Sequence, residues 1–184
     1  MNFDGWPNLS SYVFIIFFRK ETKKYYIKSN PDHKNLSGNV IVRLNPNLIY
    51  PIIKNLKILF SEHLFDVTPD QDGKLEIIVI NGNPENKDSS VKKMTYDYND
   101  TNIITVGRDK TCTISLKDKG FSKIHSSIMW NNENKFWELK DGIANKPSTN
   151  GTWIYAESSF EINDDTIIEV GSSKLRINVF ENQF

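Results

Sequence analysis

Short apolar runs, separated by turn residues, constrain the fold of this 184-residue chain more than any other feature. The runs are rich in Ile, Val, Phe, Tyr and Trp and are bounded by Asn, Asp, Gly, Ser or Pro, a pattern typical of strands joined by turns. The expected strands are 12–18, 24–28, 39–44, 56–60, 64–67, 75–80, 91–98, 102–106, 112–116, 125–131, 135–140, 152–156, 167–170 and 174–180. Many short strands at this spacing predict an all-β sandwich or barrel.

Proline interrupts residues 45–60, where scattered apolar residues would otherwise suggest a helix. Pro46 and Pro51 argue against a continuous helix there, because proline lacks the backbone N–H that a helix interior needs. No other long segment has a clean helical period, so the prediction stays all-β.

The turn PDQDGKL at residues 69–75 marks the expected boundary between two parts of the chain. It resembles a calcium-binding EF-hand loop, but Thr68 and Val79 stand where the first and the bidentate carboxylates should be. A tight Asp-Gly turn between two strands fits better. We predict a β-rich N-terminal extension or small subdomain at residues 1–73 and a second domain at residues 74–184.

Charge and cysteine content limit the classes of partner. Lys+Arg and Asp+Glu both number 23, so the net charge is zero, and any anion-binding site has to be a local cluster. The early apolar run at 12–18 is too short to span a bilayer. We therefore expect no direct nucleic-acid or membrane partner. Cys112 is the single cysteine, which favours an intracellular location, in the nucleus or the cytoplasm.

Four polar motifs follow one another in the second half of the chain. They are TVGRD at 105–109, GFSKIHSSIMW at 120–130, FWELKD at 136–141 and STNGTWIY at 148–155. Each lies where an expected strand begins or ends, so the polar residues fall on loops. Such loops are where binding residues are commonly found.

This succession resembles the forkhead-associated (FHA) domain, whose pattern is Gly-Arg, then Ser-Arg-x-His, then an aspartate, then Ser/Thr-x-Asn-Gly-Thr. The resemblance covers about residues 74–180. It implies a β-sandwich of about eleven strands that binds phosphothreonine peptides through loops at one end. The expected fold is thus an FHA-type β-sandwich with an N-terminal β-rich extension, and the expected partner is a phosphothreonine-containing protein or peptide.

The residue types fit the binding of a phosphate on a peptide. The guanidinium of Arg108 has the best geometry for phosphate oxygens, Ser122 and Thr149 can donate hydroxyls, and Lys123 can supply charge. The side-chain amide of Asn150 suits the backbone of an extended peptide, since it has both a donor and an acceptor. The resemblance carries all of these over as phosphopeptide contacts, with Lys123 at the second position of Ser-Arg-x-His.

Other residues of the pattern shape the loops. By the same resemblance these are Gly107, His125, Gly151 and Thr152. One departure is that Lys123 replaces the commoner arginine, which keeps the charge but loses the planar fork, so we expect a weaker grip on phosphate. A local basic patch in an otherwise neutral chain is formed by Lys110, Lys117 and Lys119.

A hydrolase is the first alternative, because Ser122 and His125 lie close together with Asp118 just upstream. No G-x-S-x-G elbow surrounds the serine, and His33 and His63 lack metal-ligand spacing. We therefore expect no enzymatic activity, no cofactor and no metal site.

The second alternative is a phosphate-independent scaffold or structural subunit. It would use the FHA fold and the N-terminal extension to dock a constitutive partner. Membership of a larger complex is compatible with both the scaffold and the phosphopeptide reader.

Overall fold

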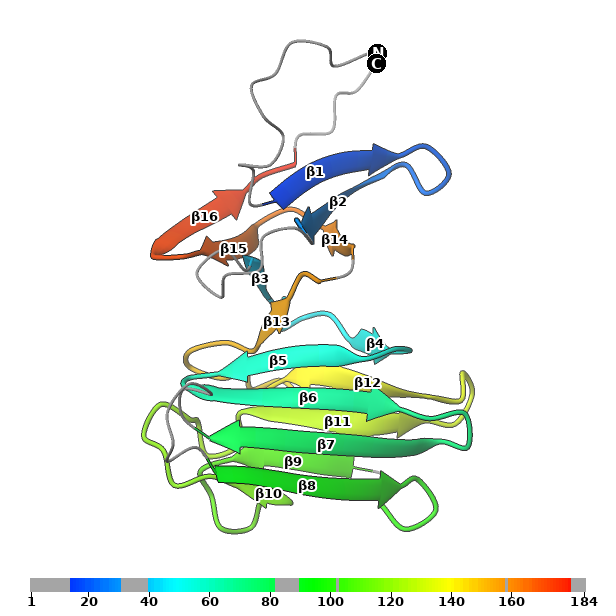
Figure 1. Cartoon of the computed structure of the whole chain (residues 1–184), viewed down its shortest axis with the longest axis vertical. Coiled ribbons are helices and arrows are strands. Elements are labelled where there is room, and N and C mark those ends of the chain that lie inside the picture. Colours follow the sequence, from blue (N-terminus) through cyan, green and yellow to red (C-terminus); the bar gives the residue numbers. More distant parts are fainter. Residues whose placement is uncertain (1–13, 31–39, 82–89, 102, 158, 180–184) are drawn as a thin grey trace. The chain divides into compact units, whose positions relative to one another are not determined.

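The computed structural model describes residues 14–30, 40–81, 90–101, 103–157 and 159–179. Over these residues the chain forms sixteen β-strands and no helix, so the all-β prediction is confirmed (Figure 1). The described residues contain no helix long and apolar enough to cross a membrane. Two compact units are present: Leu44–Ile154 is one, and the described parts of Met1–Arg43 and Tyr155–Phe184 form the other.

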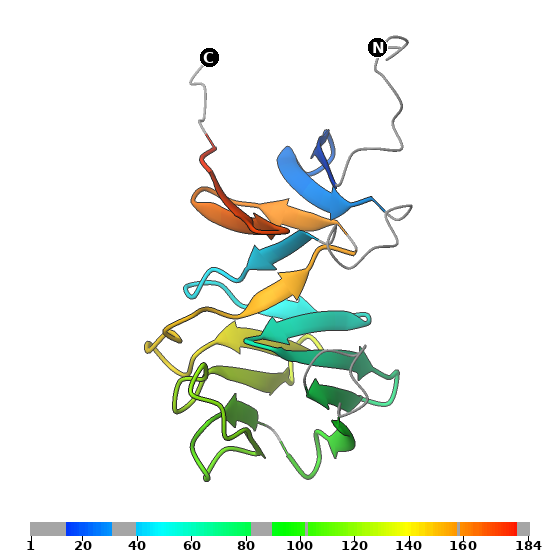
Figure 2. The same cartoon turned by 60° about the vertical axis from the view of Figure 1, so that its left-hand side comes forward.

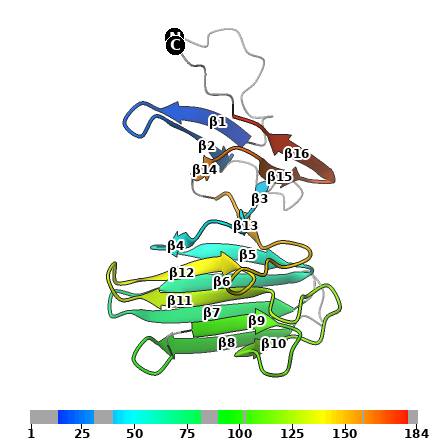
Figure 3. The same cartoon turned by 180° about the vertical axis from the view of Figure 1, so that it is seen from behind.

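The unit Leu44–Ile154 is a sandwich of two sheets, which Figures 1 and 3 show face to face. One sheet has the order β13-β5-β6-β7-β8 within this unit, and the other has the order β10-β9-β11-β12-β4. The strands are β4 (Tyr50–Ile52), β5 (Leu56–Phe60), β6 (His63–Pro69), β7 (Lys74–Asn81), β8 (Ser90–Asp97), β9 (Ile103–Gly107), β10 (Ile114–Ser115), β11 (Ser126–Asn131), β12 (Phe136–Asp141) and β13 (Trp153–Tyr155).

The core of this unit lies between its two sheets. Buried and partly exposed residues alternate along β5, β7 and β12, as expected for strands that turn one face toward a core. The large side chains that this alternation buries completely include Phe60, Ile77 and Trp137. Each such side chain stabilises the fold by about 1.5–3 kcal/mol.

The other unit is built from both ends of the chain. β2 (Lys24–Ser29) pairs with β1 (Phe14–Arg19) on one side and with β14 (Phe160–Ile162) on the other. The remaining strands of this unit are hydrogen-bonded in the order β16-β15-β3, and they are β3 (Val40–Arg43), β15 (Thr166–Val170) and β16 (Ser173–Ile177). Figure 2 shows that the blue N-terminal and orange-red C-terminal segments share this unit.

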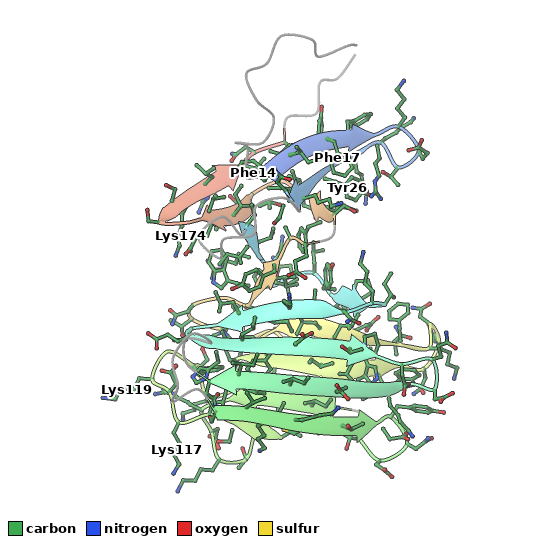
Figure 4. The ribbon with its side chains drawn as sticks, in the orientation of Figure 1. Phe14, Phe17, Tyr26, Lys117, Lys119 and Lys174 are labelled. Atoms are coloured by element: carbon green, nitrogen blue, oxygen red, sulfur yellow. The ribbon has the colours of Figure 1, made fainter. Side chains whose placement is uncertain are left out.

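Aromatic packing holds the β1–β2 hairpin of this unit. Phe17 lies opposite Tyr26 in the register, and their rings stack with centroids 5.9 Å apart (Figure 4). The guanidinium of Arg19 lies 4.3 Å from the centroid of the Tyr26 ring, at the distance of a cation–π contact.

Each expected strand overlaps a strand of the structure, and two short strands were not expected, β4 and β14. The predicted tight turn before β7 is confirmed, because the Asp70 N–H donates to the Lys74 carbonyl (2.9 Å) and Gly73 has a φ of 83°. The division into residues 1–73 and 74–184 stays a prediction. The compact units divide the chain elsewhere, and β6 and β7 pair across that boundary.

Candidate functional site

Strand pairing in the unit Leu44–Ile154 brings the polar motifs to one end of a sheet. In the register, Ser126 at the start of β11 lies between Val106 near the end of β9 and Asp141 at the end of β12. The loop that follows β9, the loop that precedes β11 and the loop that follows β12 therefore all lie at the same end of the sheet. Motifs that are far apart in the sequence meet there.

The first two of these loops are joined through their backbones. The Arg108 N–H donates to the Ser122 carbonyl and the Asp109 N–H to the Lys123 carbonyl, both at 3.1 Å. A Cβ atom on Gly107 would lie 2.2 Å from the Lys123 carbonyl oxygen, so only glycine permits this close approach. Arg108 and Lys123 are both exposed, each on a segment whose backbone is held in place.

Replacing Gly107 by alanine is expected to destabilise the protein by about 1–3 kcal/mol, because the added methyl group meets fixed backbone. Urea denaturation measures the effect. Gly120→Ala is the matched control with a smaller expected loss, since the nearest atom there is the Ser61 hydroxyl oxygen, 2.7 Å away on a side chain that can turn. Wild-type stability in Gly107→Ala would contradict this account of the loop contact.

His125 connects the loop before β11 to the loop after β12. Its Nδ1 accepts the Ser122 N–H (3.3 Å), and its Nε2 lies 3.0 Å from the Gly151 carbonyl oxygen. These partners require the neutral tautomer with hydrogen on Nε2. The side chain is 1% exposed, and burial lowers the pKa of His125, while the hydrogen bond to Gly151 and the charge of Asp141 oppose the shift.

The lowered pKa of His125 predicts a loss of stability in acid. The unfolded chain takes up the proton near pH 6.5, before the folded protein does. The contribution is therefore complete above that pH and is lost as the pH falls toward the folded-state pKa, by at most about 1.4 kcal/mol per pH unit. Urea denaturation between pH 7.5 and about pH 5 should show a shallower loss in His125→Gln than in wild type. Equal pH slopes would contradict the prediction.

Asp141 organises the loop that follows β12. Its carboxylate is 2% exposed and accepts three hydrogen bonds: from the Ser148 hydroxyl (2.6 Å), the Thr152 hydroxyl (2.7 Å) and the Ser148 N–H (3.1 Å). The Ser148 hydroxyl oxygen in turn accepts the Gly151 N–H (2.9 Å). Sequence reasoning included this aspartate in the motif but did not select Asp141 or Ser148 as site residues. One feature of the sequence could have identified Asp141 as a buried residue. It ends an expected strand and falls in the alternating series of positions whose other members are apolar.

The tip of the same loop contacts the loop before β11. The Thr149 N–H donates to the Ser122 hydroxyl oxygen (2.9 Å), and the Ser122 hydroxyl donates to the Thr149 hydroxyl oxygen (3.3 Å). The side-chain amide of Asn150 donates to the Gly120 carbonyl (2.9 Å). Thr149 and Asn150 are both exposed, so their side chains are accessible as well as positioned.

The five predicted contact residues thus lie on three mutually bonded loops at one end of the sandwich: Arg108, Ser122, Lys123, Thr149 and Asn150. Among the residues that the structure describes, the guanidinium of Arg108 has no hydrogen-bond or ion-pair partner. The four loop-structuring candidates are buried beneath them: Gly107, His125, Gly151 and Thr152. The arrangement offers cationic and hydroxyl donors to an anion.

Asp118 has a structural partner that the sequence did not indicate. Its carboxylate accepts the Gly120 N–H (2.8 Å) and lies 3.2 Å from Nε2 of His63, on the neighbouring β6. The hydrogen bond from Gly120 is the largest cause that lowers the pKa of Asp118, with smaller contributions from Ser61 and His63.

No Ser–His–Asp chain forms at this site. His125 bonds to the backbone of Ser122 rather than to its hydroxyl, and the carboxylate of Asp118 faces His63 instead. The hydrogen bonds therefore hold the loops in place and do not activate a nucleophile.

The fold and the site define a β-sandwich whose loops at one end carry cationic and hydroxyl side chains. Residues 104–171 match the family model of the FHA domain, as the resemblance predicted. The match runs from β9 to just beyond β15 and includes every candidate site residue. A search of curated proteins found no match.

FHA domains are protein–protein interaction modules rather than enzymes. FHA domains generally bind phosphopeptides, and the phosphothreonine-containing peptides that they bind belong to partner proteins.

Proposed function

We propose that this protein is a phosphothreonine-dependent interaction module, a phosphopeptide reader that acts as an adaptor in signalling or assembly. The exposed Arg108 guanidinium carries the proposal. It has no acidic partner among the described residues, and its backbone is bonded to the loop that holds Ser122 and Lys123. A charge kept unpaired beside hydroxyl donors suits an external phosphate.

Each contact residue has a distinct role in the proposal. Arg108 binds phosphate oxygens with its planar fork, while Lys123 adds charge without that geometry. The hydroxyls of Ser122 and Thr149 can rotate to donate toward the phosphate. The Asn150 amide nitrogen is bonded to Gly120, which leaves its oxygen to accept an N–H from the peptide backbone.

Threonine is the expected phosphorylated residue. Burial of its γ-methyl group in a small apolar niche would favour it over serine by up to about 1 kcal/mol. The preference is therefore modest, up to about fivefold, and has to be measured with sequences that are otherwise identical.

A peptide-library titration tests the proposal. The full chain is titrated with phosphothreonine libraries and with their phosphoserine and unphosphorylated counterparts. Binding that requires the phosphate and prefers threonine supports the reader. If no phosphorylated library member binds, or if the unphosphorylated members bind equally well, the reader function is wrong.

A phosphate-independent scaffold is the second candidate, and exposed apolar side chains favour it. On the β1–β2 hairpin, Ile15, Ile16, Phe18 and Tyr25 are between 42% and 48% exposed. Phe18 lies opposite Tyr25, with ring centroids 5.0 Å apart, and exposed apolar side chains that lie together are typical of protein contacts. A partner captured equally by wild type and Arg108→Ala, and lost on substitution of Phe18, would support this function.

The intracellular location stays a prediction. It rests on the single cysteine, Cys112, which is a free and buried thiol. Burial is the main cause that raises the pKa of this thiol, so the neutral form is favoured.

A further inference from the structure

The loop segment 107–125 is strongly basic in a chain whose net charge is zero. It carries five basic and two acidic side chains, a net charge of +3. The basic residues are Arg108, Lys110, Lys117, Lys119 and Lys123, and all five are exposed. This segment also supplies three of the proposed phosphate contacts, so the excess charge surrounds the site.

The two acidic side chains of the segment are held by internal partners. Asp109 accepts the Thr111 N–H (3.0 Å) and the Thr111 hydroxyl (2.9 Å). Asp118 accepts the Gly120 N–H and contacts His63. Over the described parts of the chain, none of the five cations lies within ion-pair distance of a carboxylate. The positive charge of the segment is therefore available to a ligand.

Two of the lysines, Lys117 and Lys119, lie between β10 and β11 and are exposed. Figure 4 shows Lys117 and Lys119 projecting outward from the same end of the unit Leu44–Ile154. Charged residues on the adjoining turns include Glu62 between β5 and β6 and Lys146 between β12 and β13, both exposed. The charges of Glu62 and Lys146 cancel, so these two residues do not change the net positive charge around the segment 107–125.

We propose that Lys117 and Lys119, with Lys110, select phosphothreonine peptides that carry further negative charge close to the phosphothreonine. This inference rests on the proposed reader function. The additional anion is an acidic side chain or a second phosphate, since both present oxygen anions to an exposed ammonium group. Attraction between exposed charges speeds association and adds modest affinity, about three- to tenfold at low salt.

Fluorescence anisotropy with labelled peptides tests the inference on the full chain. Peptides sharing one phosphothreonine carry neutral flanks, acidic residues before it, acidic residues after it, or a second phosphothreonine. An unphosphorylated acidic peptide completes the set. We expect a charged flank to bind about three- to tenfold tighter than the neutral one at about 0.05 M salt. The difference should nearly vanish at about 0.5 M salt, where charges are screened within a few ångströms.

A double variant assigns the preference to the lysines. Lys117→Gln/Lys119→Gln should reduce the advantage of the charged flank to less than about twofold and leave the neutral phosphopeptide unaffected. Lys74→Gln/Lys135→Gln is the matched control, because these exposed lysines lie at the opposite ends of β7 and β12 from the loops. The control should retain the full advantage.

Three results would overturn the inference. They are equal binding of neutral and charged flanks, an undiminished advantage in the lysine variant, and binding of the unphosphorylated acidic peptide as tight as that of its phosphorylated form. If Arg108→Ala abolishes binding while the flank has no effect, only the inference fails. If no phosphopeptide binds at all, the reader function fails with it.

Discussion

Arg108→Ala is expected to weaken phosphothreonine-peptide binding by about 2–3 kcal/mol, or about 30- to 150-fold, because a bidentate charge-assisted contact is lost. The guanidinium has no partner among the described residues, so the fold should not depend on it. Isothermal titration calorimetry measures the affinity. Thermal unfolding should show wild-type stability within about 0.5 kcal/mol.

Two further substitutions make the Arg108 experiment specific. Arg108→Lys keeps the charge but not the fork, so its affinity should lie between those of wild type and Arg108→Ala. Lys92→Ala removes an exposed charge from β8 and should bind as wild type does. A wild-type affinity in Arg108→Ala would show that the phosphate does not contact this side chain.

Asp141→Ala is expected to lower the free energy of unfolding by about 3 kcal/mol. The substitution leaves three buried donors without their acceptor: the Ser148 N–H and the hydroxyls of Ser148 and Thr152. Urea denaturation measures the loss. Peptide affinity should fall as well, since Thr149 and Asn150 belong to the loop that Asp141 holds.

An exposed aspartate provides the control for Asp141. Asp72 lies in the turn before β7, and its replacement by alanine should change stability by less than about 0.5 kcal/mol. If Asp141→Ala is as stable as Asp72→Ala, the buried hydrogen bonds do not hold the loop.

The strands could be predicted from the sequence where apolar residues alternate over several positions, as in β5 and β7. Two strands of three residues were missed, because they are too short to show a period. β4 also contains Pro51, which argues against a strand in a sheet interior. The structure resolves the conflict, because β4 is the edge strand of its sheet.

Long-range pairing could not be predicted from local pattern. β2 pairs with β14, so strands from opposite ends of the chain form one sheet. Which residues of two such distant strands pair depends on the whole fold, and the sequence of either strand alone does not indicate its partner. The predicted boundary at residue 73 was based on a turn, and a turn can equally join two neighbouring strands of one sheet.

The motifs predicted which loops meet but not how they are held together. Gly107 was expected to shape a loop, and the structure gives the reason, a backbone approach that leaves no room for a Cβ atom. The contact between His63 and Asp118 joins residues 55 positions apart and has no local signal. Asp118 was set aside once the hydrolase was rejected, yet it shapes the turn that positions Gly120, the acceptor for Asn150.

Nuclear magnetic resonance titration of the 15N-labelled full chain tests most directly whether these loops read phosphothreonine. Adding a phosphothreonine peptide should shift the amide signals of Arg108, Ser122, Lys123, Thr149 and Asn150 in a saturable manner. The signals around Trp137, at the opposite end of β12, should stay in place. Phosphatase treatment of the peptide should abolish the shifts. Shifts that persist without phosphate, or that gather away from the three loops, would contradict the reader function.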